Sequence, residues 1–290
     1  MKRILKIVLP ALLCVLPLRG QNPARELLSE VRFFTDSLQA GRGVGTPGVQ
    51  GAVFYLLRQL RDAGLMTTVQ SFDAGGRAGH NVVAVTPGWF RSYIVVGAYL
   101  DGLGTLEGVM YPGADANASG LVALLTLARS LPAACNGPTG LIFVAYDGHH
   151  ADLAGSRAFL ERYRRQYKIV RLVNLDILGS SLAPVNPERS DYLIALGGAP
   201  FRKQLEAANG TAGLDLSFDY YGSSAFTELF YRKISDQRWA LEAGIPSVMF
   251  TSGITLNTNK PADTAPSLNY PVFLRRIRLI SDWLSELVKK

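Results

Sequence analysis

The sequence predicts a single α/β domain whose β-sheet is covered by helices on both faces. Short, almost continuously apolar runs of strand length alternate with longer segments in which apolar residues recur at helical spacing. Glycine and proline separate these segments, and no internal repeat, linker or low-complexity stretch divides the chain. A strand that is apolar along its whole length is buried on both sides, so helices must cover both faces of the sheet.

Two helices open the predicted domain. Apolar residues at helical spacing indicate a helix over 23–38, and the glycine-rich stretch 41–48 after it can only be an irregular loop. A second helix is expected over 49–63, ended by Gly64, because glycine commonly follows the last residue of a helix.

Strands and helices then alternate to the end of the chain. Apolar runs between glycine and proline breaks predict strands at 69–72, 81–85, 93–98, 141–146, 169–175, 192–196 and 247–250. Helical spacing predicts further helices at 117–131, 153–163, 201–208, 239–243 and 270–288. The last of these is amphipathic and closes the domain.

Composition fits a globular protein. The 290 residues are 48% hydrophobic, 18% charged and 10% aromatic, which excludes disorder, collagen and coiled coil. Four cationic residues and no acid lie in the first 20 residues, so the net charge of +7 falls to about +3 for the remainder. With 23 acidic residues along the chain, this charge is no nucleic-acid signature, and we expect no nucleic-acid partner.

The N-terminus reads as a secretory signal peptide over 1–20. A basic start at Lys2 and Arg3 precedes a mostly apolar run that is too short and too interrupted to span a bilayer, and Gly20 offers a cleavage site. We therefore expect a domain over 21–290 that is exported to the periplasm or secreted. No later stretch approaches about 18 continuous apolar residues, so the protein should not span a membrane. An N-terminal anchor helix and a lipidated Cys14 are the alternatives; Leu13 argues against the second.

Cys135 is the only cysteine outside the leader. A single thiol can form neither an intrachain disulfide nor a cysteine-based zinc site. Any metal chemistry must therefore use acids and imidazoles.

Acids and imidazoles gather where the predicted strands end. The ligand crevice of an open α/β sheet lies beyond the carboxyl ends of its strands, so these side chains are the candidate site. Several carboxylates and imidazoles there would suit a metal hydrolase. The candidates are Asp101, Asp115, Asp147, His149, His150, Asp176 and Asp263.

The residues and the order of several motifs resemble those of the M28 family of zinc exopeptidases. The motifs are Gly45–Gly48, Asn81–Val85, Gly113–Gly120, Gly155–Arg157, Asn174–Asp176, Leu241–Pro246 and Pro261–Thr264. Each is weak alone, but in this order they cover nearly the whole chain after the leader. The resemblance implies a three-layer α/β/α domain with a mixed, mostly parallel sheet.

The resemblance also implies two zinc ions held by five side chains, and the chain retains one of these five. Asp176 is the retained ligand. The other ligand positions hold Tyr99 for a histidine, Ala116 for the bridging aspartate, His150 for a glutamate and Asn259 for the final histidine. His149 stands at the general-base position, which the family fills with glutamate. Asp101, Asp115, Asp147 and Asp263 would lie behind the site, where Asp101 would orient the first ligand.

These substitutions predict a non-catalytic relative. Zinc needs about three or four N, O or S donors, and in the family arrangement Asp176 and His150 would serve different ions. His149 could accept a proton near pH 6.5, but without a metal-bound water it has nothing to activate. We therefore expect no cofactor, and a peptide or protein ligand bound through the old cleft. Phe226, Tyr231 and Trp239 are candidate residues for the rim of that cleft.

Two alternatives stay open. The protein could be an active zinc aminopeptidase with a reorganised metal site around His149, His150 and Asp176. It could instead follow the related glutaminyl cyclases, whose single zinc would use the positions of Ala116, His150 and Asn259; this set fits no better. If no metal binds, the two histidines fill the vacated pocket and form hydrogen bonds with the neighbouring acids.

Overall fold

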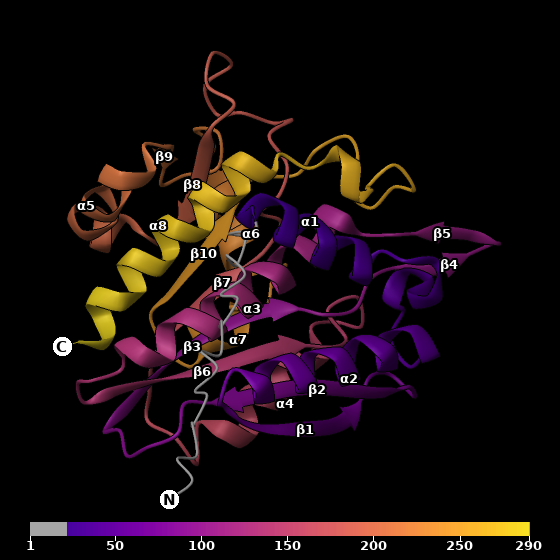
Figure 1. Cartoon of the computed structure of the whole chain (residues 1–290), viewed down its shortest axis with the longest axis horizontal. Helices are drawn as coiled ribbons and strands as arrows, with labels where there is room; N and C mark the ends of the chain where they lie inside the picture. Colours follow the sequence, from indigo (N-terminus) through magenta and orange to yellow (C-terminus); the bar gives the residue numbers. More distant parts are fainter. Residues whose placement is uncertain (1–21, 290) are drawn as a thin grey trace, which may run out of the picture.

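Eight strands form one twisted sheet in the computed structural model, which describes residues 22–289 (Figure 1). The predicted signal peptide lies outside these residues. The strand order is β1-β2-β6-β3-β7-β10-β8-β9. The bounds are β1 Met66–Asp73, β2 Ala78–Val85, β3 Ser92–Tyr99, β6 Thr139–Tyr146, β7 Ile169–Leu175, β8 Tyr192–Leu196, β9 Asp215–Ser217 and β10 Ser247–Thr251.

The sheet is mixed and mostly parallel, as expected. Strand β3 pairs in parallel with both β6 and β7, β7 with β10, and β8 with β9. The pairs β1–β2, β2–β6 and β10–β8 are antiparallel. Because β6, β3, β7 and β10 are consecutive and parallel, their carboxyl ends lie along one stretch of the same sheet edge.

Helices cover both faces of the sheet, which gives the three-layer α/β/α domain. One core includes α1 (Pro23–Phe34), α2 (Pro47–Asp62), α3 (Gly120–Ser130), α5 (Arg202–Ala212) and α8 (Tyr270–Val288). A second core on the opposite face includes α4 (Ala154–Tyr163) and α7 (Arg238–Glu242). A smaller third cluster adds α6 (Ser224–Arg232) beside β8 and β10.

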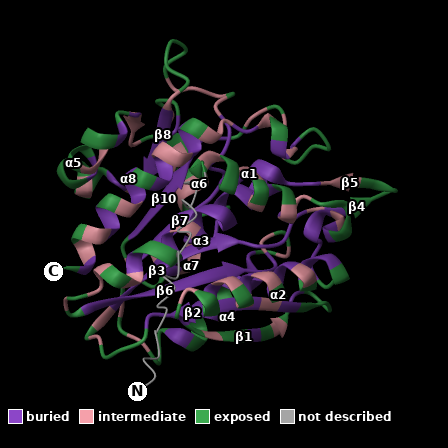
Figure 2. Ribbon diagram, in the orientation of Figure 1, coloured by how far each residue is buried: buried purple, intermediate pink, exposed green. Residues whose placement is uncertain are grey.

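The apolar strands divide their side chains between these cores. In β6, Leu141, Phe143 and Ala145 join the first core, whereas Ile142, Val144 and Tyr146 join the second. All six are fully buried, as Figure 2 shows for the central strands in general. Successive side chains of a strand point to opposite faces of the sheet, and here both faces are buried. Every position of the strand is therefore apolar, which explains the continuous apolar runs.

The helix predicted over 117–131 begins only at Gly120. Ala116 and Asn117 have non-helical backbone angles within an irregular turn over Ala114–Ser119. The Asn117 side chain donates to Leu175 O (3.0 Å) and accepts from Ile177 N (3.0 Å), so it joins this turn to the end of β7. Those contacts, rather than helical spacing, set the start of α3.

Several other elements depart from the prediction. The first helix ends at Phe34, and a 3₁₀ segment over Ser37–Arg42 leaves Leu38 exposed. Helix α6 and strand β9 were not predicted from the sequence. Neither was the hairpin of β4 (Gly104–Leu106) and β5 (Val109–Tyr111), which projects from the domain (Figure 1). No helix within 22–289 has the length and apolar character needed to cross a bilayer.

Candidate functional site

A small cavity opens at the shared carboxyl edge of β3, β6, β7 and β10. Its volume is about 120 Å³. Five of the sequence-predicted site residues line it, namely Tyr99, His149, His150, Asp176 and Asn259. Tyr99 is the last residue of β3, the histidines follow β6, and Asp176 directly follows β7. The topology therefore brings together side chains that are up to 160 positions apart.

Asp101 fixes the backbone of both histidines. Its Oδ1 accepts from His149 N (2.7 Å) and its Oδ2 accepts from His150 N (3.0 Å). The Nδ1 atom of His150 lies 3.1 Å from the same Oδ2. Burial would raise the pKa of Asp101, but the His150 hydrogen bond and the two nearby imidazoles lower it overall. This carboxylate thus acts mainly on main-chain groups.

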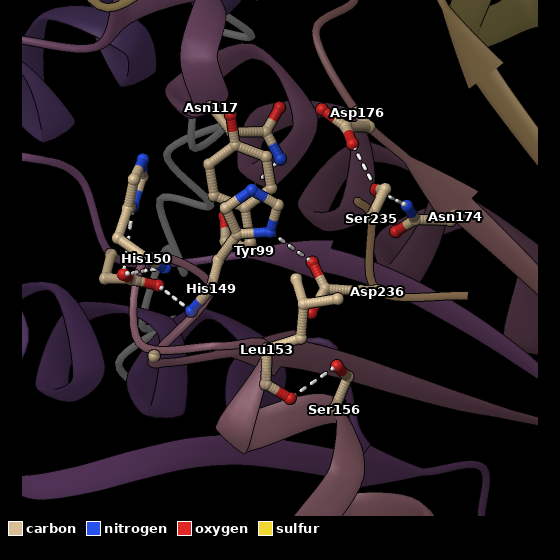
Figure 3. Close-up of polar contacts among 12 residues, drawn as sticks. Tyr99, Asn117, His149, His150, Leu153, Ser156, Asn174, Asp176, Ser235 and Asp236 are labelled. Atoms are coloured by element: carbon tan, nitrogen blue, oxygen red, sulfur yellow. Dashed lines mark hydrogen bonds and ion pairs between the residues drawn. The ribbon is translucent and has the colours of Figure 1, made fainter. Parts of the chain in front are cut away.

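His149 lies between an aromatic ring and a second carboxylate (Figure 3). Its imidazole stacks on Tyr99, with 3.9 Å between ring centroids and an interplanar angle of 13°. Its Nδ1 is 2.8 Å from Asp236 Oδ2, and the Asp236 side chain is fully buried. Burial lowers the pKa of His149, but the charge and hydrogen bond of Asp236, with the charges of Asp176 and Asp101, raise it to about 9.

Asp176 is held by the connection between α6 and α7. Ser235 Oγ donates a short hydrogen bond to its Oδ2. Asn174 Nδ2 in turn donates to Ser235 Oγ (2.9 Å) and to Gln237 Oε1 (2.7 Å). Burial raises the pKa of Asp176, against the lowering effect of His149 and Ser235. The acid that the resemblance identifies as a retained ligand therefore has a hydroxyl partner within the protein.

Asp263 and Asp115 shape the turn that carries Ala116. Asp263 accepts from the backbone N–H of Asp115 (2.7 Å) and of Ala116 (3.0 Å). Asp115 Oδ1 accepts from Gly179 N (2.7 Å), so it points to the loop after β7. Burial and the Asp263 charge raise the pKa of Asp115 to about 7. Both acids are structural here, and the Ala116 methyl group offers no donor atom.

Asp147 faces away from the cavity. Its carboxylate accepts from His80 N (2.8 Å) and Gly148 N (2.9 Å), and its own N–H donates to Asn81 Oδ1 (3.0 Å). Burial, then the Asp101 charge, raises its pKa to about 7. Asp147 thus joins β2 to the loop that carries the histidines.

Comparison with known proteins decides the family. The family model for peptidase family M28 matches residues 81–284. The chain belongs to peptidase family M28. It is 28% identical over 157 residues to leupeptin-inactivating enzyme 1 of Streptomyces exfoliatus, which covers 53% of this chain and 35% of that enzyme. It is 25% identical over 283 residues to YfbL of Escherichia coli K12, an uncharacterized protein, covering 88% of this chain and 86% of YfbL.

A solved zinc aminopeptidase shows the same architecture. The zinc aminopeptidase BSAP from Bacillus subtilis superposes with a TM-score of 0.74 at 14% sequence identity, covering 92% of this chain and 95% of that one. At this identity the likeness shows the fold alone. The chain spans about a third of the length of the Streptomyces enzyme.

The rim of the cavity in this M28 protein differs from the aromatic candidates named above. Neither Phe226, Tyr231 nor Trp239 lines the cavity. Trp239 donates to Leu153 O (3.1 Å), Tyr231 donates to Ser247 O (2.7 Å), and Phe226 is an exposed neighbour of Phe230. The apolar lining comes instead from Ile177, Tyr220, Phe230, Ile234, Met249 and Ile254.

Asp236 and Ser235 are the polar site residues that sequence reasoning missed. They lie on the connection before α7, far along the chain from the histidines and Asp176 that they contact. A polar Ser-Asp-Gln run before a short helix was the only available signal, and it is indistinguishable from an ordinary surface turn.

The donors at the site are arranged in pairs. Among residues 22–289, no group of three or more His, Cys, Asp or Glu side chains has an arrangement that could hold a metal ion. Figure 3 shows His150 and Asp176 on opposite sides of the Tyr99–His149 ring stack. Each remaining acid or imidazole has a partner within the protein: His149 with Asp236, His150 with Asp101, and Asp176 with Ser235.

Proposed function

We propose that this M28 protein is a non-catalytic member of its family and binds a peptide or protein partner through the cavity at the carboxyl edge of the sheet. The observation that carries the proposal is that, in the part of the chain that the structure describes, no group of three or more His, Cys, Asp or Glu side chains could hold a metal ion. We further propose that binding takes place after export, in the periplasm or outside the cell, as the predicted signal peptide implies.

The donor set supports this proposal because it does not fit a pair of zinc ions. Alanine at 116 and asparagine at 259 supply neither carboxylate nor imidazole, and the Tyr99 ring is covered by His149. The bridging carboxylate that would let two dications lie close together is missing. Among residues 22–289, His150 and Asp176 also belong to no group of three or more acidic, imidazole or thiol side chains that could hold a metal ion.

Cavity size and chemistry support a single side chain as the part of the partner that enters. A volume of about 120 Å³ is well below the roughly 300–1,000 Å³ of small-molecule sites. The walls combine apolar and polar side chains, and two of the apolar residues continue onto the surface, where Ile234 is 43% and Ile254 46% exposed. An apolar side chain would fill the cavity while its neighbours cover these exposed residues.

The second candidate is an active zinc aminopeptidase with a reorganised site. The observation in its favour is that His149, His150 and Asp176 all line one cavity. This function needs His149, His150 and Asp176 to converge on one ion, and as they stand they form no such group within residues 22–289. It predicts a bound metal and hydrolysis of aminoacyl substrates.

Metal content and hydrolysis of aminoacyl-nitroanilides separate the two functions. We expect protein purified without chelator to contain less than one zinc per ten chains and to show no hydrolysis that a zinc chelator abolishes. Stoichiometric zinc that disappears in His150→Ala would overturn the non-catalytic proposal.

Titration calorimetry with a library of short peptides tests binding. Peptides with a large apolar side chain should bind, and Ile234→Asp should weaken them at least tenfold. Met66→Asp, also an exposed apolar residue but at the opposite edge of the sheet at the start of β1, is the control and should leave affinity unchanged. Equal affinity for polar and apolar peptides would contradict the proposed binding mode.

A further inference from the structure

The sheet edge opposite the cavity carries a second surface with its own chemistry. Three segments meet there: 86–91 before β3, 131–138 before β6, and 164–168 before β7. Arg91 N donates to Pro138 O (2.8 Å), and Tyr93 N donates to Lys168 O (2.9 Å). The 8 residues of β3 separate this edge from Tyr99, a distance of roughly 25 Å. The arrows of β3 and β6 in Figure 1 point away from it.

The side chain of Trp89 is fully exposed to solvent at this edge. Its exposure is 101% of that of an isolated residue, the highest among the exposed large apolar side chains. The turn that carries it is nevertheless fixed, because the next residue, Phe90, packs edge-on against Tyr93 with 5.8 Å between ring centroids. A tryptophan normally contributes a large buried area to a core or an interface, so an indole held outward on a fixed turn indicates a surface that receives it.

Exposed cations lie on the same three segments as this indole. Arg91, Arg164, Arg165 and Lys168 are all exposed. None forms an ion pair with a carboxylate within the described residues, unlike Arg232 and Arg238 on the neighbouring helices. The three segments 86–91, 131–138 and 164–168 contain no Asp or Glu at all. Within the described chain the edge therefore presents the charges of Arg91, Arg165 and Lys168 without an ion-pair partner, whereas Arg164 shares a shallow surface pocket with Glu161 and Glu242.

We propose that the tryptophan edge, defined as Trp89, Arg91, Arg164, Arg165 and Lys168, docks on the surface of a bilayer containing anionic phospholipids. Indole rings favour the headgroup region, where an apolar ring and a polar N–H are both accommodated. Each Lys or Arg near an anionic leaflet adds to the attraction. Together they provide the two signals that reversible peripheral binding needs.

A bilayer fits these observations better than a nucleic acid. Single-stranded nucleic acid is bound by a succession of stacking rings along a cationic groove, whereas this edge offers one free ring. Docking through this edge would also leave the cavity facing away from the membrane, open to a soluble partner.

Tryptophan fluorescence of the full chain tests the proposal directly. The chain has three tryptophans; Trp283 is buried and Trp239 is half-buried, so a change of environment on docking reports Trp89. Vesicles of phosphatidylcholine with about one-third phosphatidylglycerol should shift the emission to the blue, and brominated lipid should quench it. Pure phosphatidylcholine vesicles should produce little of either effect. The leader contains no tryptophan, so any affinity of its own does not enter this signal.

Two variants and one matched control complete the test. Trp89→Ala should abolish the shift, and R164Q/R165Q/K168Q should weaken vesicle binding about a hundredfold. The control R25Q/R77Q/K260Q removes three equally exposed cations elsewhere and should change binding less than threefold. All substituted side chains are exposed, so unchanged melting curves verify folding. No shift on anionic vesicles, an equal shift on neutral ones, an equal loss in the control, or a shift with an oligonucleotide alone would each overturn the proposal.

Discussion

Replacing Asp236 by asparagine should change the protonation state of His149 and, with it, the pH dependence of stability. Asparagine has the size of aspartate but no charge. The two side chains are 2.8 Å apart, and the His149 side chain is only 15% exposed, so solvent screens their interaction weakly. Without Asp236, the burial that already lowers the pKa of His149 is opposed only by Asp176 and Asp101.

The magnitude follows from the pKa of His149. Its rise from 6.5 to about 9 corresponds to about 3 kcal/mol of folding free energy, at about 1.36 kcal/mol per unit. The folded-state pKa is above the unfolded one. This stability is therefore fully present below pH 6.5 and is lost as the pH rises through about 9. In Asp236→Asn most of that pH-dependent loss should disappear.

Imidazole NMR and urea unfolding measure the two effects. The chain has three histidines, so three ring signals need assignment. In the wild type His149 should remain protonated at about pH 8, and the free energy of unfolding should fall by about 3 kcal/mol more between about pH 6 and 9.5 than in Asp236→Asn. Asp62→Asn, an exposed acid, is the control. A wild-type His149 that titrates near 6.5, or equal pH profiles for wild type and Asp236→Asn, would refute this reasoning.

Two further predictions concern the scaffold. Arg42 is fully buried and donates to the carbonyls of Phe34, Leu100, Pro112 and Gly113. Arg42→Met should therefore lower the free energy of unfolding by at least about 3 kcal/mol in urea titrations. The control Arg77→Met, at an exposed position, should lower it by less than about 0.5 kcal/mol, and a loss as large as that of Arg42→Met would contradict this role of Arg42. A Cβ at Gly97 would lie 2.3 Å from the buried ring of Tyr146, so Gly97→Ala should lower stability by about 1–3 kcal/mol. Gly210 in α5 has open space around it, and Gly210→Ala should raise stability by about 0.5–1 kcal/mol in the same urea titrations; equal effects at both sites would refute the packing argument.

Periodicity was sufficient to predict the central elements of the fold. The bounds of β7, β8 and α8 agree with the prediction to the residue, because a buried strand or an amphipathic helix can be recognised from the pattern of its apolar residues. The missed elements are short. Strand β9 has three half-buried residues, too few to show a period, and α6 is amphipathic but has only 9 residues, none of them fully buried.

The site was predictable where it follows strands and unpredictable where it does not. Tyr99, His149, His150 and Asp176 lie at strand ends, and parallel pairing forces strand ends together. Asp236 reaches His149 from a connection between two helices, and no local rule of sequence fixes where such a connection lies. The side-chain partners that give the site its electrostatics therefore had to come from the structure.

The Asp101 carboxylate accepts hydrogen bonds from the backbone N–H groups of residues 149 and 150, so the backbone of this loop does not depend on which side chains these positions carry. Evolution could therefore exchange the chemistry of the loop without rebuilding it. A histidine pair can stand at the positions where the resemblance to the family implies two glutamates, while the backbone of the loop stays the same.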